Sequence, residues 1–185
     1  MLIILDRDGV INEDSANYVR GPDDWHPIEG SLAAIADLSK AGHRIAIATN
    51  QSGLSRGYFT LDDMELIHAQ LCARVEAQGG QIAGIFYCPH LPEEGCHCRK
   101  PATGLLDAIA RELSEPLAGN PFIGDSLKDL QAAERSGCLP ILVRTGKGNS
   151  SYDALQTGTH GLAHPEAVRV FPNLRAAADA LLTEL

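Results

Sequence analysis

Two aspartates placed one residue apart, Asp6 and Asp8, directly follow a short apolar run near the start of the chain. The run Leu2–Leu5 is typical of a buried strand, and Gly9 comes after the second aspartate. Alternate side chains of an extended backbone share a face, so both carboxylates are predicted to point the same way, with Arg7 turned elsewhere. Crowded carboxylates stay ionised only beside a positive charge. At the end of a parallel strand this favours Mg²⁺ with phosphate over a strand that merely ends in a polar turn.

A second group of residues with metal-binding chemistry lies in mid-chain. Cys88 and His90 are followed, after a short stretch that contains Pro and Gly, by Cys96 and Cys98. Three thiolates and one imidazole suit a closed tetrahedral Zn²⁺ site with no position left for water. His97 is a competing ligand, and buried cysteines beside a surface histidine are the alternative interpretation. We predict a structural zinc that pins the loop leading to the next basic residues.

Apolar runs alternate with segments of helical period, which predicts an α/β fold with a doubly wound parallel sheet flanked by helices. The predicted strands are Leu2–Asp6, Ile45–Thr49, Ile85–Cys88, Phe122–Asp125, Ile141–Val143 and, more weakly, Ala167–Phe171. The predicted helices are Ser31–Ala41 with Ser31 as its N-cap, Leu61–Gln78, Gly104–Leu113, Leu127–Ser136 and Asn173–Leu182. The polar, Gly-rich stretch Thr145–His164 is expected to be a surface loop. No insertion is large enough for a second domain, so residues 1–185 are expected to form one domain.

Composition narrows the range of partners. A formal net charge of -9 argues against nucleic-acid binding, whereas an anionic substrate stays compatible, because a metal and local cations reverse the sign inside a cleft. No apolar stretch is long enough to span a membrane, and no basic segment precedes the N-terminal run as in a secretion signal. The five cysteines, an odd number, argue against a disulfide framework. We therefore expect a cytoplasmic protein and, without an evident exposed apolar stripe, a monomer.

Four short motifs occur in order along the chain, and three of them lie at predicted strand ends. They are Asp6-Arg7-Asp8-Gly9-Val10, Thr49-Asn50-Gln51-Ser52-Gly53, Arg99-Lys100-Pro101 and Gly124-Asp125-Ser126-Leu127-Lys128-Asp129. Together they resemble the motifs of the haloacid dehalogenase (HAD) superfamily of phosphotransferases, over nearly the whole chain. The resemblance implies a Rossmann-like, HAD-like sheet with a minimal cap, and Mg²⁺-dependent hydrolysis of a phosphomonoester.

The resemblance also assigns chemical roles. Asp6 is implied as the nucleophile that forms an aspartyl-phosphate, and Asp8 as the general acid for the departing alkoxide and then the base that activates water. Mg²⁺ is implied to bind the Asp6 carboxylate, the Asp8 backbone carbonyl and Asp125.

The same resemblance implies that Thr49 and Lys100 hold the phosphoryl oxygens through a hydroxyl and an ammonium. Asp129, one helical turn beyond Asp125, is implied to orient Lys100 or to complete the metal shell.

Within the superfamily, a zinc loop directly before Arg99-Lys100-Pro101 resembles two groups, the heptose bisphosphate phosphatases and the histidinol phosphatases. The segment that begins with the second motif, Thr49–Phe59, resembles the heptose group, and so do the upstream runs Tyr18–Asp24 and Pro27–Gly30. This implies removal of the C7 phosphate of D-glycero-D-manno-heptose 1,7-bisphosphate, in nucleotide-heptose supply for lipopolysaccharide. A histidinol-phosphate phosphatase is the alternative, and a non-catalytic zinc-stabilised binding module is a more remote one.

A sugar bisphosphate needs cationic contacts away from the reacting end. Arg99, beside Lys100, is predicted to supply one, because a guanidinium fork suits a phosphate or a cluster of hydroxyls; Arg56 and Lys147 are further candidates. Other residues predicted to contact the substrate follow the first motif or belong to the second: Asp14, Ser15, Ala16, Asn17, Asn50, Gln51 and Ser52. Ser126 stands where some relatives carry a lysine, which removes one possible cationic contact.

Overall fold

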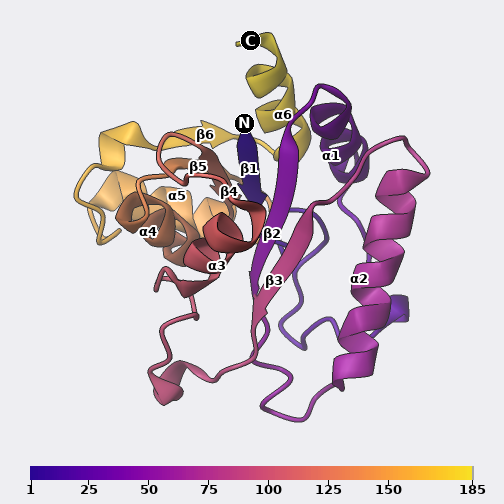
Figure 1. The fold of residues 1–185 in the computed structure, drawn as a ribbon. Helices are drawn as coiled ribbons and strands as arrows, with labels where there is room; N and C mark the ends of the chain where they lie inside the picture. The colour runs from indigo at the N-terminus through magenta and orange to yellow at the C-terminus, as the bar shows by residue number, and fades with distance from the viewer. Residues whose placement is uncertain (185) are drawn as a thin grey trace.

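A six-stranded, all-parallel sheet forms the centre of the computed structural model, which describes residues 1–184 (Figure 1). The strand order is β3-β2-β1-β4-β5-β6, so the direction of winding reverses between β1 and β4, as in a doubly wound fold. Every predicted strand is present, including the weak last one. The strands are β1 (Leu2–Leu5), β2 (Arg44–Asn50), β3 (Gly84–Cys88), β4 (Pro121–Gly124), β5 (Leu139–Val143) and β6 (Arg169–Phe171).

Helices cover both faces of this sheet. One face packs against α1 (Ser31–Lys40), α2 (Leu61–Glu76) and α6 (Leu174–Thr183), and the other against α3 (Gly104–Leu113) and α4 (Leu127–Arg135). Short 3₁₀ turns occupy Pro22–Asp24 (η1), Pro92–Glu94 (η2) and Pro165–Ala167 (η3). This three-layer arrangement confirms the predicted α/β fold with helices on both sides of a parallel sheet.

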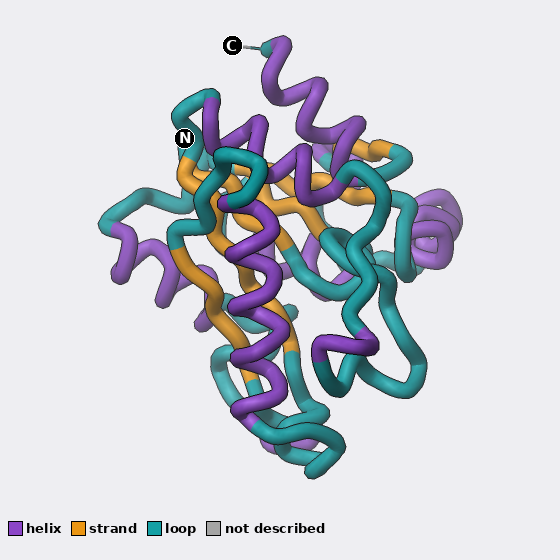
Figure 2. Tube along the Cα trace, turned by 90° about the vertical axis from the view of Figure 1, so that its right-hand side faces the viewer, coloured by secondary structure: helices purple, strands orange, loops and turns teal. Residues whose placement is uncertain are grey.

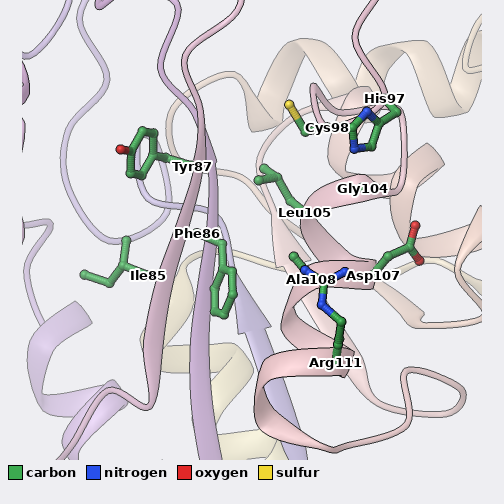
Figure 3. Close-up of a pocket in the computed structure, with 10 residues that line it drawn as sticks. All are labelled: Ile85, Phe86, Tyr87, His97, Cys98, Gly104, Leu105, Asp107, Ala108 and Arg111. Atoms are coloured by element: carbon green, nitrogen blue, oxygen red, sulfur yellow. The ribbon is translucent and has the colours of Figure 1, made fainter.

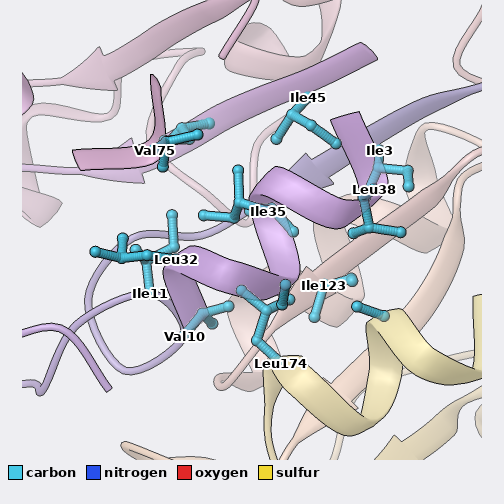
Figure 4. Packing of buried hydrophobic residues seen from close by; sticks show 14 of the residues in the cluster. Ile3, Val10, Ile11, Leu32, Ile35, Leu38, Ile45, Val75, Ile123 and Leu174 are labelled. Atoms are coloured by element: carbon cyan, nitrogen blue, oxygen red, sulfur yellow. The ribbon is translucent and has the colours of Figure 1, made fainter. Parts of the chain in front are cut away.

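Strand β1 shows how the apolar runs divide between the two faces. Ile3 joins the cluster under α1, α2 and α6 (Figure 4), whereas Leu2 joins the cluster under α3 and α4. Both residues have no exposed surface. In a strand that is buried on both faces, every side chain contacts the core. The strand is therefore a continuous apolar run in the sequence, without the alternation of apolar and polar residues.

Two predictions about individual elements are wrong. The stretch Thr145–His164 is not all loop, because it contains the helix α5 (Gly148–Thr157). Ser31 does not cap α1: the cap position is Gly30, in the left-handed region at φ 78°, and the Ser31 hydroxyl donates instead to the Ile11 carbonyl at 2.6 Å. In both cases contacts with distant parts of the chain outweigh the preference of the local sequence.

The longer loops gather at the end of the molecule away from both termini (Figures 1 and 2). Residues 6–30, which connect β1 to α1, hold only the turn η1 and isolated bridges at Asn12, as the minimal cap predicts. Within residues 1–184, none of the helices combines the length and apolarity needed to span a lipid bilayer.

Candidate active site

A pocket of about 580 Å³ opens at the carboxyl ends of the central strands. Asp6 and Asp8 reach it from the end of β1, Thr49 from the end of β2, and Asp125 from the residue after β4. Lys100, from the loop before α3, also lines it. The strand order reverses at β1 and β4, and this is the place where doubly wound sheets leave a crevice for a ligand.

Lys100 is the buried cation at the floor of this pocket. Its ammonium lies 2.9 Å from Asp6 Oδ1 and 2.6 Å from Asp129 Oδ1, and donates to the Ala48 carbonyl at 2.8 Å. Burial opposes the positive charge, but the carboxylates of Asp129 and Asp6 outweigh burial and raise the pKa of Lys100 above its ordinary value. Asn50 fixes the backbone of Lys100 from both sides, accepting from its N–H at 3.0 Å and donating to its carbonyl at 3.1 Å.

Negative charge exceeds positive charge at the pocket floor. Asp6, Asp125 and Asp129 are all buried, and each offers one carboxylate oxygen to a cluster in which these oxygens lie within 4.8 Å of one another. Burial and the Asp129 carboxylate raise the pKa of Asp6 to about 7, despite Lys100. Burial and the Asp6 carboxylate likewise raise the pKa of Asp125 to about 8. This crowded set of hard oxygen donors fits Mg²⁺, whose charge would favour the ionised carboxylates.

Asp125 is fixed by the segment that was expected to be a plain surface loop. The Lys147 N–H donates to Asp125 Oδ2 at 2.8 Å, and the Ser151 hydroxyl donates to the Asp125 carbonyl at 2.8 Å. Two glycines let the carboxylate approach: a Cβ on Gly9 would lie 2.0 Å from Asp125 Oδ2, and one on Gly146 would lie 2.2 Å away. The start of α5 therefore belongs to the site, which the sequence interpretation missed.

Asp8 is held by three side chains. The Arg7 Nη2 donates to both of its oxygens, at 2.8 and 3.0 Å, Asn12 donates to Oδ1 at 2.9 Å, and Gln51 donates to Oδ2 at 2.8 Å. Burial alone would raise the pKa of Asp8, but the Arg7 charge and these hydrogen bonds lower it below its ordinary value. The prediction that Arg7 turns away is therefore wrong for its guanidinium. Gln51 also donates to Thr49 Oγ1 at 2.9 Å, which leaves the threonine hydroxyl hydrogen free for a ligand.

The pocket wall contains nearly all the residues predicted to contact a substrate. Asn17 and Arg56 are the exceptions among the described residues. Asn17 is outside the lining, and its carbonyl accepts from Arg20 Nε at 2.8 Å. Arg56 is exposed and outside the lining as well. The predicted residues that do line the pocket are Asp14, Ser15, Ala16, Asn50, Gln51, Ser52, Arg99 and Lys147.

Lys128 is a lining residue that sequence reasoning left without a role. Its pKa is lowered, first by burial and then by the nearby charges of Arg99 and Lys147. Within residues 1–184, neither Lys128 nor Arg99 pairs with a carboxylate, whereas Lys147 pairs with Asp14 at 3.2 Å. Two cations without carboxylate partners thus face a pocket whose floor is acidic. The signal for Lys128 was its place in the first turn of a helix that begins at the site.

The cysteine–histidine cluster forms beside this pocket. The Cys88 sulfur lies 3.1 Å from that of Cys98 and 3.6 Å from that of Cys96, and His90 Nδ1 lies 3.2 Å from the Cys98 sulfur. Zn–S bonds of ~2.3 Å in a tetrahedron place sulfurs roughly 3.8 Å apart, so the donor set fits Zn²⁺. His97 is not part of this group among the described residues.

A second hollow, of about 460 Å³, lies between β3 and α3 (Figure 3). His97 and Cys98 close one end of it, and the side chains of Phe86 and Leu105 face it from the strand and the helix. A Cβ on Gly104 would lie 2.5 Å from the His97 carbonyl, so α3 can begin this close to the loop only with glycine there. The cysteine loop is therefore packed directly against the helix that follows Lys100.

Comparisons with known proteins place the chain in a family. A family model described as HAD-hydrolase-like matches residues 97–177. A D-glycero-beta-D-manno-heptose-1,7-bisphosphate 7-phosphatase of Pseudomonas putida is 50% identical over 181 residues, which cover 98% of this chain and 99% of the relative. This chain belongs to that phosphatase family of HAD-like hydrolases. A member from Pseudomonas aeruginosa is 49% identical over 98% of this chain and 97% of its own.

The fold of this HAD-like phosphatase is also that of a solved relative. The D,D-heptose 1,7-bisphosphate phosphatase of B. bronchiseptica, whose crystal structure is complexed with magnesium and phosphate, superimposes with a TM-score of 0.91 at 47% identity. The match covers 100% of this chain and 99% of the other. The magnesium and phosphate of that crystal structure match the metal and the phosphate chemistry expected from the four motifs.

Proposed function

We propose that this chain removes the C7 phosphate from D-glycero-beta-D-manno-heptose 1,7-bisphosphate and leaves the 1-phosphate in place. The observation that carries the proposal is the 50% identity, over 98% of the chain, to a phosphatase of that name. The pocket supports it, because buried carboxylates and a buried ammonium meet at the end of a parallel sheet, where phosphoryl transfer needs charge neutralisation and positioning.

In this proposal Asp6 is the nucleophile. Its carboxylate oxygen forms a bond to phosphorus while the bond to the sugar oxygen breaks, which gives an aspartyl-phosphate that water then hydrolyses. Lys100, 2.9 Å from Asp6, and the free Thr49 hydroxyl would hold the phosphoryl oxygens. Mg²⁺, bound by Asp6, the Asp8 carbonyl and Asp125, would neutralise charge on the phosphoryl group. Asp129 would orient Lys100, to which it lies 2.6 Å away.

Asp8 is proposed as the general acid and base. It lines the same pocket as Asp6, and its carboxylate is held by Arg7, Asn12 and Gln51. The pKa of Asp8 is lowered in the free site, and the negative charge of a bound phosphoryl group would raise it. The protonated carboxyl would then give its proton to the departing sugar oxygen, and the resulting carboxylate would take one from the attacking water.

Arg99 and Lys128 are proposed to bind the phosphate that does not react. Both line the pocket and neither pairs with a carboxylate in the described part of the chain. A histidinol phosphate would bring an ammonium to this wall, where two cations would repel it. The charge of the wall therefore favours a bisphosphate over the alternative substrate. The wall residues Asp14, Ser15, Ala16, Asn50, Gln51 and Ser52 would surround the sugar, and Asn17 would act only through its loop.

Zinc is proposed as a structural cofactor, bound by Cys88, His90, Cys96 and Cys98. The Arg99 N–H donates to the Cys96 sulfur at 3.4 Å, so the cluster is hydrogen-bonded to the residue next to Lys100. The metal would order the loop and would thereby hold Arg99 and Lys100 at the pocket.

The wider setting is proposed on the same basis. Residues 1–185 would form one domain that acts as a monomer. The enzyme would work in the cytoplasm, without nucleic-acid or membrane partners, in nucleotide-heptose supply for lipopolysaccharide.

The test compares two substrates under identical conditions. Phosphate release from the heptose bisphosphate and from histidinol phosphate is measured with Mg²⁺, for the wild type and for Asp6→Asn. We expect turnover of the heptose bisphosphate by the wild type alone. Faster turnover of histidinol phosphate, or turnover by Asp6→Asn, would overturn the substrate or the nucleophile assignment, respectively.

A further inference from the structure

Arg7 stands between the two proposed catalytic aspartates in the sequence, and its guanidinium holds the Asp8 carboxylate. It is among the largest fully buried side chains, with 1% of its surface exposed. A guanidinium at that depth needs partners for all its donors, because a buried charge without them is costly. Its Nε and Nη2 are satisfied by Asp8, at 3.0 Å and 2.8 Å from Oδ1.

The remaining nitrogen of this guanidinium meets a histidine from another element. Arg7 Nη1 lies 3.1 Å from Nε2 of His68, which is on α2. Arginine has donors and no acceptor, so the imidazole nitrogen facing it must be the unprotonated acceptor. Burial and the Arg7 charge lower the pKa of His68 to about 4, in agreement with a neutral ring. His68 thus serves as an acceptor of the guanidinium and not as an acid.

The three residues form a chain of contacts that ends at the pocket. The His68 ring contacts one nitrogen of the Arg7 guanidinium, and the other two nitrogens hold the Asp8 carboxylate. Gln51 holds the other oxygen of Asp8 at 2.8 Å. Without His68 the guanidinium keeps its charge pair but loses the contact that sets its rotation.

We propose that His68 is a positioning residue that orients the Asp8 carboxylate through Arg7. The inference rests on the proposed function, since it assigns a second layer of support to the proposed general acid and base. Misplacing a reacting group by a fraction of an ångström affects the chemical step more than substrate binding. The expected signature is therefore a lower kcat at nearly constant KM.

The experiment uses His68→Ala, His68→Gln and, as a matched control, Leu71→Ala. Leu71 is fully buried on the same helix, so its truncation lowers stability without touching Arg7. We expect His68→Ala to lower kcat about 10-fold with KM unchanged, His68→Gln to recover most of kcat because its amide oxygen is again an acceptor, and Leu71→Ala to lower Tm but keep kcat.

Steady-state kinetics are measured on the heptose bisphosphate and on p-nitrophenyl phosphate, so that two failures can be told apart. If the wild type hydrolyses neither ester, the proposed function fails; if the wild type is active and His68→Ala keeps its kcat, only the positioning role fails. Nitrogen-15 NMR of the wild type adds a readout that needs no variant. An unprotonated Nε2 on His68 at neutral pH supports the proposal, and a protonated Nε2 contradicts it.

Discussion

The substitution Lys100→Met tests the charge balance of the pocket floor. It keeps an unbranched side chain one atom shorter and removes the ammonium that lies 2.9 Å from Asp6 and 2.6 Å from Asp129. The two carboxylates then face each other and Asp125 without a buried cation. Breaking a buried ion pair by removing one partner costs about 3–5 kcal/mol.

The size of the expected effect on melting follows from the length of the chain. With 185 residues and an unfolding entropy of about 2.1 cal/mol/K per residue, 3–5 kcal/mol corresponds to a Tm lower by roughly 8–13 °C. The loss depends on pH, because the pKa of Asp6 is about 7 and that of Asp125 about 8 even with Lys100 present. A carboxyl with a raised pKa binds a proton in the folded protein at a pH where the unfolded chain has released it. The free energy of unfolding therefore rises as the pH falls through the pKa of the folded state.

The assay is thermal unfolding of Mg²⁺-free wild type and Lys100→Met at pH 8 and pH 5. We expect a large gap in Tm at pH 8 that narrows at pH 5, where the carboxyls of the variant are protonated. Asp129→Asn is the matched control, since it removes one carboxylate and leaves Lys100 paired with Asp6; its loss should be smaller. If Lys100→Met has the same Tm as the wild type at pH 8, or if the difference in Tm is larger at pH 5, Lys100 does not stabilise the protein by neutralising these carboxylates.

Three further predictions concern the metals. Gly146→Ala should weaken Mg²⁺ binding at least 10-fold by calorimetry, because the new Cβ would lie 2.2 Å from Asp125 Oδ2. The control is Gly158→Ala, which is also at positive φ but has no atom within 4 Å of the new Cβ, and it should keep the affinity of the wild type. Equal Mg²⁺ affinities of the two variants would contradict a clash with Asp125. Mg²⁺ affinity should fall as the pH drops from 8.5 to 6, because the metal must displace protons from Asp6 and Asp125, whose pKa values are about 7 and 8; calorimetry in two buffers should detect proton release, and a pH-independent affinity would exclude it. Mass spectrometry should find one zinc per chain, and stripping it should lower both Tm and kcat; loss of zinc with neither change would rule out its structural role.

The site could be predicted where local sequence and sheet topology are enough. Asp6, Thr49 and Asp125 each end or follow an apolar run, and parallel strands bring such positions to one edge. The residues proposed to bind zinc, Cys88 to Cys98, lie close together in the sequence, so their spacing alone restricted the geometry of the cluster. The strands were likewise evident, because a sheet buried on both faces leaves continuous apolar runs.

What could not be predicted depends on contacts between distant residues. Helix α5 was missed because Gly146, Gly148 and Gly158 give its segment the composition of a loop, whereas the helix is anchored by Ser151 on the Asp125 carbonyl. Strand alternation sets where a Cβ points, but the long side chain of Arg7 bends back to its neighbour Asp8. Its contact with His68 joins residues 61 positions apart, a distance at which sequence pattern carries no signal.

Phosphorus NMR of the reaction product tests the central claim most directly. The heptose bisphosphate is incubated with the wild-type protein and Mg²⁺, and the two phosphate resonances are followed over time. We expect the C7 resonance to be replaced by that of inorganic phosphate while the C1 resonance persists, and neither to change with Asp6→Asn. Loss of the C1 phosphate, or an unaltered spectrum with the wild type, would contradict the proposed function.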